Sequence, residues 1–324
     1  MQEKLALLVW PAVYPAAWDD AIAVVRDHGV GGVVLFATEG WDADTLSTRL
    51  AQLDAVTSSG LVIAADEEGG DVQRLRGLGA LPSQQEMSES MAPAAATRMI
   101  ADHAAAVRAT GVDVVLGPVA DVVPADGVVS LDRSRFFTGD AGTVTTFAGA
   151  YLDAWSSRGI VPVLKHYPGH GSASADTHLG VGVTDPLATL EVSDLVPYRE
   201  LGDSGAAVMV GHLTVPDLTG DLPATRSPAA IDLLRDTLGY GDALVISDAL
   251  GMGAVGLTVD AAAVEAITAG IDVAIFTDTS LTAEVIDALE AAVTDGTLSV
   301  GRVDDAARRV LRVTGAADLG CDPD

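Results

Sequence analysis

The chain has 324 residues, of which 49% are hydrophobic and only 4% aromatic, and its formal net charge is −28. This excess of acidic groups repels phosphate backbones and anionic lipid surfaces, so the composition argues against nucleic-acid and membrane partners. The few aromatic residues also argue against a base-stacking platform.

Eight short apolar runs rich in β-branched residues recur along the chain and are typical of parallel strands buried on both faces. The predicted strands are Leu5–Val9, Gly32–Phe36, Leu61–Ala65, Val112–Leu116, Ile160–Leu164, Ala206–Val210, Ala243–Ser247 and Asp272–Phe276. Alanine-rich amphipathic segments between them predict helices at Trp18–His28, Asp44–Val56, Pro93–Thr110, Thr143–Ser157, Thr258–Ala269 and Leu281–Val293.

Eight strands alternating with helices predict an α/β fold of the (β/α)8 TIM-barrel type, and we expect residues 1–324 to form a single domain. The main alternative is an open doubly wound sheet with a glycine-rich phosphate loop after an early strand. No GxGxxG or P-loop pattern follows an early strand of the sequence, and we predict no cofactor.

The amino-terminal stretch is apolar, but it carries only Lys4 as a positive charge and runs into acidic residues, unlike a signal peptide. No apolar run approaches the roughly 18 residues of a membrane span. The lone Cys321 excludes an intrachain disulfide and a cysteine-based metal cluster. These features predict a cytoplasmic protein.

Polar residues gather where the predicted strands end, which is where barrel enzymes carry their reactive groups. Glycoside hydrolysis needs one group that protonates the leaving oxygen and another that captures the oxocarbenium-like centre. Asp248, directly after the seventh strand, is a candidate for the second group. The alternative is that Asp248 is the N-cap of a helix over Leu250–Val255.

Asp176 and His178 form a candidate acid/base pair, because a carboxylate two residues away can orient an imidazole that titrates near neutrality. The alternative is an Asx-turn with a loop histidine. A metal site would draw on His166 and His170 as well, but the intervening Pro-Gly breaks the helix that would align them, so we predict no metal. The adjacent Glu67 and Glu68 are expected to pair with nearby arginines.

Several segments together resemble family 3 glycoside hydrolases, namely the β-N-acetylglucosaminidases of the peptidoglycan-recycling type. The segment LKHYPGHGSASADTH is similar to their K-H-(F/I)-P-G-(H/L)-G-x4-D-(S/T)-H signature, and DEEGGDVQRL is similar to DQEGGRVQR. The segments VMVGHLTVPDLTGDLPATRS and LVISDALGMGAV resemble VM-x-x-H…PA-x-x-S and SDDL-x-MGA. These blocks keep the family order from Asp66 to Val255. Asp71, Glu67 and Ala249 depart from the family pattern, where Arg, Gln and a second Asp are common.

The resemblance implies a role for each matching residue. Asp248 matches the nucleophile that forms a covalent glycosyl-enzyme, His178 matches the acid/base, and Asp176 matches its partner. The matching positions that hold the terminal sugar are Asp66, Arg74, Lys165, His166 and Arg133, with His212 in the VM-x-x-H segment. Arg135 lies two residues after Arg133, so either arginine fits that position. The implied activity is retaining hydrolysis of terminal β-linked N-acetylglucosamine from a glycan or muropeptide, a small carbohydrate substrate.

Two other functions fit the same residues. A phosphorylase would use phosphate instead of water to open the glycosyl-enzyme, and an imidazole acid/base tolerates a phosphate dianion better than a carboxylate does. A non-catalytic barrel could bind amino sugar as a sensor or carrier. The presence of Asp248, Asp176 and His178 together favours catalysis over simple binding.

Overall fold

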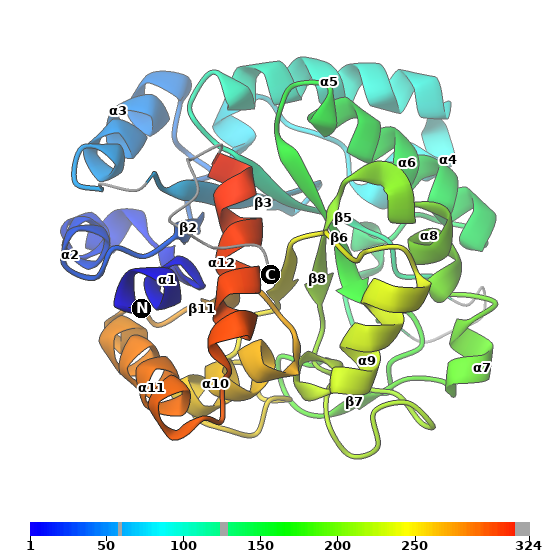
Figure 1. Ribbon diagram of the computed structural model, residues 1–324. Coiled ribbons are helices and arrows are strands. Elements are labelled where there is room, and N and C mark those ends of the chain that lie inside the picture. The colour runs from blue at the N-terminus through cyan, green and yellow to red at the C-terminus, as the bar shows by residue number, and fades with distance from the viewer. Residues whose placement is uncertain (58–59, 124–128, 315–324) are drawn as a thin grey trace.

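The computed structural model describes residues 1–57, 60–123 and 129–314, and its centre is a ring of parallel strands (Figure 1). The ring consists of β1 Val9–Val13, β2 Gly32–Leu35, β3 Val62–Gly69, β5 Val114–Val119, β6 Val161–Tyr167, β8 Ala207–Val210, β10 Val245–Ser247 and β11 Ala274–Phe276. Strand β1 pairs with β11. A bridge between Ile246 of β10 and Val273, the residue before β11, closes the ring. The predicted TIM barrel is therefore confirmed.

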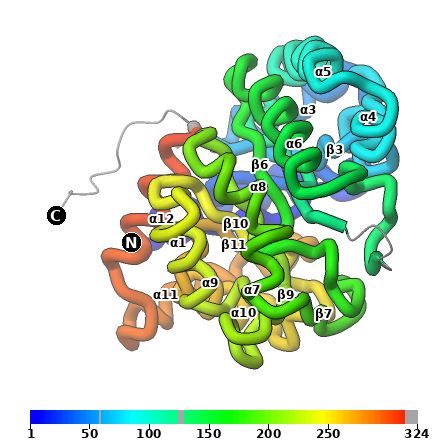
Figure 2. The backbone as a smooth tube through the Cα atoms, turned by 90° about the vertical axis from the view of Figure 1, so that its right-hand side faces the viewer, coloured from blue at the N-terminus to red at the C-terminus, as the bar shows by residue number. Residues whose placement is uncertain are grey.

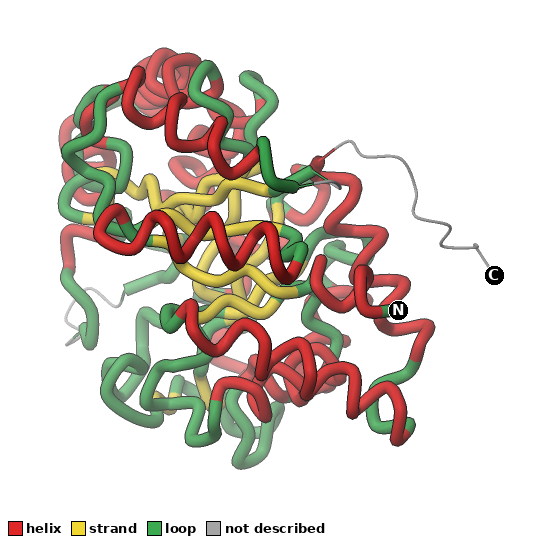
Figure 3. Tube along the Cα trace, turned by 90° about the vertical axis from the view of Figure 1, so that its left-hand side faces the viewer, coloured by secondary structure: helices red, strands yellow, loops and turns green. Residues whose placement is uncertain are grey.

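Helices surround the strands on all sides (Figure 3). They are α1 Gln2–Leu7, α2 Trp18–His28, α3 Ala43–Asp54, α4 Gln84–Ser90, α5 Pro93–Arg108, α6 Ala141–Ser156, α7 Leu187–Leu190, α8 Leu195–Glu200, α9 Pro228–Asp232, α10 Val259–Ala269, α11 Thr282–Asp295 and α12 Val300–Thr314. The six predicted helices are all present, with ends that differ by no more than two residues. Asp42 and Asp140 begin α3 and α6 by accepting a hydrogen bond from the backbone N–H three residues on.

The buried residues of the strands are mostly Val, Ala, Leu and Ile, and the larger rings among them are Trp10, Tyr167 and Phe276. Trp10 on β1 is fully buried, and its indole lies against the start of β2. A Cβ at Gly32 would come within 2.8 Å of that ring. Glycine at this position therefore lets a tryptophan fit where the neighbouring strand enters the barrel.

The first predicted strand is wrong in its position. Leu5–Leu7 belongs to α1, and the strand begins only at Val9. The run LALLV is apolar throughout, so its periodicity could not separate a buried helix from a strand. Leucine and alanine favour the helix, whereas Val9, Trp10 and Val13 favour the strand that follows.

The two faces of the barrel differ. In Figure 2 the amino terminus, α1 and α12 lie on one side, and the short strands β7 Gly182–Val183 and β9 Leu213–Thr214 lie on the other. This second side is where the strands end and where the polar residues of the sequence gather. Among the described residues, none of the helices combines the length and apolar character that crossing a bilayer requires.

Candidate active site

A buried cluster of charges joins the ends of β3 and β6, which lie on either side of β5. The Lys165 ammonium is 2.8 Å from Oδ1 of Asp66 and 2.7 Å from Oε1 of Glu68. Arg135 binds the same Glu68 carboxylate with two hydrogen bonds of 2.7 and 2.9 Å. Each of these buried charged groups therefore has a partner of opposite charge. Strands β3 and β6 accordingly extend through charged residues that look like loop in the sequence.

The cluster fixes the ionisation of its members. Burial would raise the pKa of Glu68, but Lys165 and Arg135 outweigh it and hold that pKa at about 2. Burial would lower the pKa of Lys165, but Asp66 and Glu68 outweigh it and raise that pKa above its usual value. Lys165 therefore remains an ammonium with Asp66 as its second partner, at the edge of the barrel mouth.

Arg74 extends this cluster towards β2. Its Nη2 lies 3.6 Å from Oδ2 of Asp66, its Nη1 donates to Oε1 of Glu39 at 2.9 Å, and its guanidinium stands 5.1 Å from the centre of the Phe36 ring. The carboxylates and the ring hold the guanidinium in one orientation. Asp66, Arg74 and Lys165, all predicted to bind sugar, are thereby brought together.

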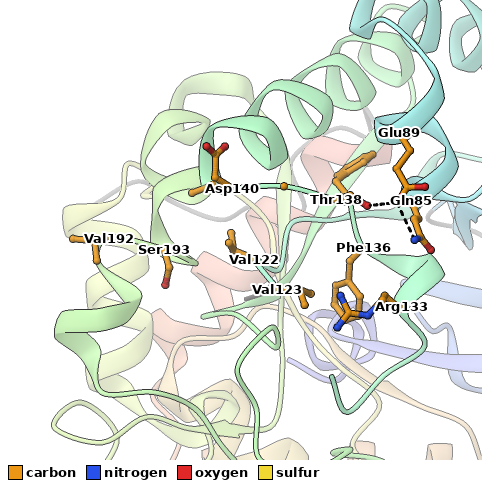
Figure 4. Close-up of a pocket in the computed structure, with 13 residues that line it drawn as sticks. Gln85, Glu89, Val122, Val123, Arg133, Phe136, Thr138, Asp140, Val192 and Ser193 are labelled. Carbon is orange, nitrogen blue, oxygen red and sulfur yellow. Dashed lines mark hydrogen bonds between the residues drawn. The ribbon is translucent and has the colours of Figure 1, made fainter. Parts of the chain in front are cut away.

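Arg133 lies elsewhere. It is exposed and lines a pocket of about 630 Å³ beside the barrel mouth, together with Val123 and Phe136 (Figure 4). The family resemblance predicts a sugar contact by Arg133, whereas Arg135 is the arginine that the structure brings to Glu68 and Lys165. Both arginines belong to one short 3-10 turn, Arg133–Arg135. Arg133 points outward and Arg135 points inward, so the two positions are not equivalent.

His166 is held by a buried carboxylate that the sequence reasoning missed. Asp121 accepts a hydrogen bond from Nδ1 of His166 at 2.9 Å and another from the His166 backbone N–H at 3.1 Å. The imidazole therefore presents Nε2 to the barrel mouth. Burial would raise the pKa of Asp121, but His166 outweighs it and the pKa lies below its usual value.

Asp248 directly follows β10 and is partly accessible. Its Oδ1 accepts the Ala249 backbone N–H at 2.8 Å, and the described part of the chain supplies no hydrogen bond to Oδ2. Burial would raise its pKa, but His166 and the Ala249 N–H contribute to lowering the pKa below the usual value. Residues 250–255 form turns and not a helix, so the N-cap alternative is wrong. Asp248 is an ionised carboxylate at the barrel mouth.

Asp176 and His178 form a close pair on the loop after β6. The Nδ1 atom of His178 lies 2.6 Å from Oδ1 of Asp176, and the His178 backbone N–H donates to the same oxygen at 3.0 Å. The segment is thus an Asx-turn and an oriented imidazole at once, so the two alternatives were compatible. Nδ1–H donates to the carboxylate, which leaves Nε2 of a half-exposed histidine for proton transfer.

The chain as a whole matches the model of the glycosyl hydrolase family 3 N-terminal domain over residues 1–313. It belongs to glycoside hydrolase family 3. It is 40% identical to Beta-hexosaminidase LpqI of Mycobacterium tuberculosis over 334 aligned residues, covering 99% of this chain and 84% of that protein. The expectation of a glycoside hydrolase is confirmed by this membership.

Solved structures of other family 3 proteins share the barrel. A family member from Mycobacterium smegmatis is 39% identical, with a TM-score of 0.89 over 97% of each chain. A β-N-acetylglucosaminidase from Paenibacillus is 28% identical, with a TM-score of 0.89 over 97% of this chain and 62% of that one. These similarities agree with the family resemblance on which the site residues were assigned.

For His212, the structure of this family 3 barrel supports a different role from the predicted one. The ring is fully buried, Nδ1 lies 2.9 Å from Oγ1 of Thr225, and Nε2 lies 3.0 Å from the carbonyl oxygen of Ala249. Both ring nitrogens are therefore engaged within the protein. His212 holds the residue that follows Asp248, instead of presenting a nitrogen to the sugar.

The predicted role of the two glutamates after Asp66 is half right. Glu68 pairs with an arginine, whereas Glu67 pairs with His103 at 2.7 Å and accepts the Leu75 backbone N–H at 2.6 Å. Glu67 thereby fixes the turn between Asp66 and Arg74 from behind. No local motif marks His103, because it lies in the middle of α5 and meets Glu67 only in the folded barrel.

Proposed function

We propose that this protein is a retaining exo-β-N-acetylglucosaminidase, with Asp248 as nucleophile and His178 as acid/base. The observation that carries the proposal is the placement of an ionised carboxylate and an oriented imidazole on two loops joined by backbone hydrogen bonds. Gly253 N–H donates to the carbonyl oxygen of His178 at 3.2 Å, and Ala254 N–H donates to that of Thr177 at 3.1 Å. These backbone bonds hold the loop that carries His178 against the loop that follows Asp248.

In the first step the Asp248 carboxylate attacks the anomeric carbon of the sugar. The bond from that carbon to the leaving oxygen breaks, and the oxygen takes the proton from Nε2 of His178. Asp176 stabilises the protonated imidazole before the transfer and keeps Nδ1 in place throughout. The product is a glycosyl ester on Asp248 and a free alcohol on the aglycone.

In the second step a water molecule attacks the anomeric carbon from the side that the aglycone has left. His178 Nε2 accepts the water proton, and the bond to Asp248 breaks to restore the carboxylate. Two displacements at one carbon keep the β configuration. An imidazole performs both roles without the repulsion that a second carboxylate near Asp248 would create.

The proposed sugar-binding groups are Asp66, Arg74, Lys165, His166 and Arg135. Their hydroxyl partners would be those of a terminal N-acetylglucosamine, in line with the relatives described as β-hexosaminidase and β-N-acetylglucosaminidase. Carboxylates, guanidinium groups and an ammonium bond neutral hydroxyls strongly because at least one partner is charged. We further propose that muropeptide fragments are the natural substrates, as in peptidoglycan recycling.

The test is release of p-nitrophenol from p-nitrophenyl N-acetyl-β-glucosaminide by the wild type, Asp248→Ala and a control variant, Asp278→Ala. Asp278 is also an aspartate near a strand end, two residues after β11, where it caps the 3-10 turn Thr279–Leu281. We expect Asp248→Ala to lose at least about a thousandfold in kcat and Asp278→Ala to retain activity. A folded wild type that releases nothing would overturn the proposal.

Two further measurements sharpen the test. Adding phosphate decides between water and phosphate as acceptor, because a sugar 1-phosphate product would identify a phosphorylase. Comparing a GlcNAc–anhydromuramic acid disaccharide with N,N′-diacetylchitobiose tests the muropeptide proposal, which predicts the higher kcat/KM for the former.

A further inference from the structure

Thr177 lies between Asp176 and His178 in the sequence, and its side chain points into the protein. Asp176 and His178 are 31% and 56% exposed in their side chains, whereas Thr177 is buried to 1%. The Thr177 hydroxyl lies 3.1 Å from Nε2 of His170, which is itself buried to 2%. A buried hydrogen bond between Thr177 and His170 therefore lies beneath the Asp176–His178 pair. The proposed mechanism assigns no role to either residue.

His170 is fixed on several sides. Its backbone N–H donates to Oδ1 of Asp121 at 2.7 Å, and its Nδ1 lies 3.2 Å from the Ser130 hydroxyl. The same Asp121 carboxylate holds His166. One buried carboxylate thus places both a proposed sugar ligand and the histidine beneath the dyad.

We propose that His170 is a positioning residue that sets the Asp176–His178 pair through the Thr177 hydroxyl. This inference rests on the proposed function, because it concerns where the acid/base nitrogen stands relative to Asp248. The opposite side of Thr177 supports it, since its carbonyl oxygen accepts the Ala254 N–H of the nucleophile loop. Thr177 is held on one side by the bond to His170 and on the other by the backbone bond to Ala254, so the chain is anchored directly before His178.

The chemistry of the two groups suits this task. Burial lowers the pKa of His170, so the ring is neutral and carries one donor and one acceptor nitrogen. Hydroxyl groups on both sides, from Thr177 and Ser130, can donate or accept as the tautomer requires. The bond between Thr177 and His170 can therefore form with either tautomer of the neutral ring.

The test compares a substrate that needs the acid with one that needs it little. Thr177→Val removes the hydroxyl while nearly keeping the shape of the side chain, and Thr177→Ser keeps the hydroxyl as the matched control. A sugar alcohol leaves N,N′-diacetylchitobiose only when protonated, whereas p-nitrophenolate leaves readily without a proton. We expect Thr177→Val to lower kcat/KM about 10- to 100-fold on chitobiose and less than about threefold on the nitrophenyl substrate.

His170→Leu approaches the same bond from the other side. It is expected to show the same selective loss, and the double variant should lose no more than the worse single variant. Thr177→Ser should retain the wild-type ratio of the two kcat/KM values. Thermal unfolding of each variant shows that the compared proteins are folded.

An equal loss on both substrates, or no loss on either, would show that the bond is merely structural and would overturn the inference. A selective loss in Thr177→Val but not in His170→Leu would remove His170 from the role. If the wild type cleaves neither substrate, the proposed function fails and this inference fails with it. Activity in the wild type with a flat response in the variants defeats the inference alone.

Discussion

The Lys165 ammonium lies 2.7 Å from Oε1 of Glu68, and neither side chain is more than 2% exposed. Removing the lysine would leave Arg135 as the remaining cation beside the buried Glu68 carboxylate and would take from Asp66 its partner at 2.8 Å. We expect Lys165→Met to lower the free energy of unfolding by about 3–5 kcal/mol, measured by urea denaturation, and to raise KM for the sugar.

Lys4 offers a matched control, because it is the other lysine of the sequence and also pairs with an aspartate, Asp304 at 2.7 Å. That pair is partly exposed, so Lys4→Met should cost less than about 1 kcal/mol. Adding Glu68→Gln to Lys165→Met should lower the stability further, because Arg135 then loses its buried carboxylate as well. Equal costs at the two lysines would show that burial of the Lys165 pair contributes nothing.

His212 provides a test of support for the nucleophile. His212→Phe removes the bonds to Thr225 and to the Ala249 carbonyl, so the residue next to Asp248 loses its anchor. We expect kcat to fall about tenfold or more from displacement of the carboxylate. Thr225→Val breaks only the Nδ1 bond and should have the smaller effect. A raised KM with unchanged kcat would instead favour the sugar contact predicted from the sequence.

The sequence was sufficient for the fold because the alternation of buried runs and amphipathic helices is a property of neighbouring residues. It also made Asp248 and the Asp176–His178 pair candidates for catalysis, because a carboxylate after a strand and an Asp-x-His spacing are local features. Strand ends were set too early at β3 and β6, because Asp66, Glu68 and Lys165 look like loop residues until their charges are paired across strands.

The supporting side chains could not be predicted because their partners are distant along the chain. Asp121 is 45 residues before His166, and His103 is 36 residues after Glu67. The choice between Arg133 and Arg135 depends on how a three-residue turn is oriented, and no periodicity extends through a segment that short. A contact of this kind is decided by the closed barrel and not by any one segment.

At Asp272 we expect a substitution to lower stability without changing the catalytic rate. Its fully buried carboxylate binds Arg235 at 2.8 Å and Arg309 at 3.2 Å and also contacts Arg302, which joins α12 to the barrel on the face opposite the site. Asp272→Asn should lower the free energy of unfolding by about 3 kcal/mol or more, with kcat of the folded protein unchanged. The exposed Asp242, 3.6 Å from Arg312, is the control, and Asp242→Asn should change stability by less than about 0.5 kcal/mol.

Asp194 predicts a pH dependence of stability. It lies beneath the turn at Gly169, is 2% exposed, and accepts hydrogen bonds from Val122 N–H and the Ser193 hydroxyl. Burial, together with the nearby Asp121, raises its pKa to about 7. The folded protein therefore keeps a proton on Asp194 that the unfolded chain releases near the ordinary aspartate pKa.

The stability that comes from this proton is complete at acid pH, falls as the pH rises towards 7, and changes little above that value. Asp194→Asn cannot titrate and keeps a similar shape, so it should lack this loss. The difference in unfolding free energy between variant and wild type should grow in favour of the variant by roughly 1–3 kcal/mol from pH 4.5 to 7.5. Urea denaturation at several pH values measures it, and a difference that stays constant over this range would mean that Asp194 is ionised in the folded barrel.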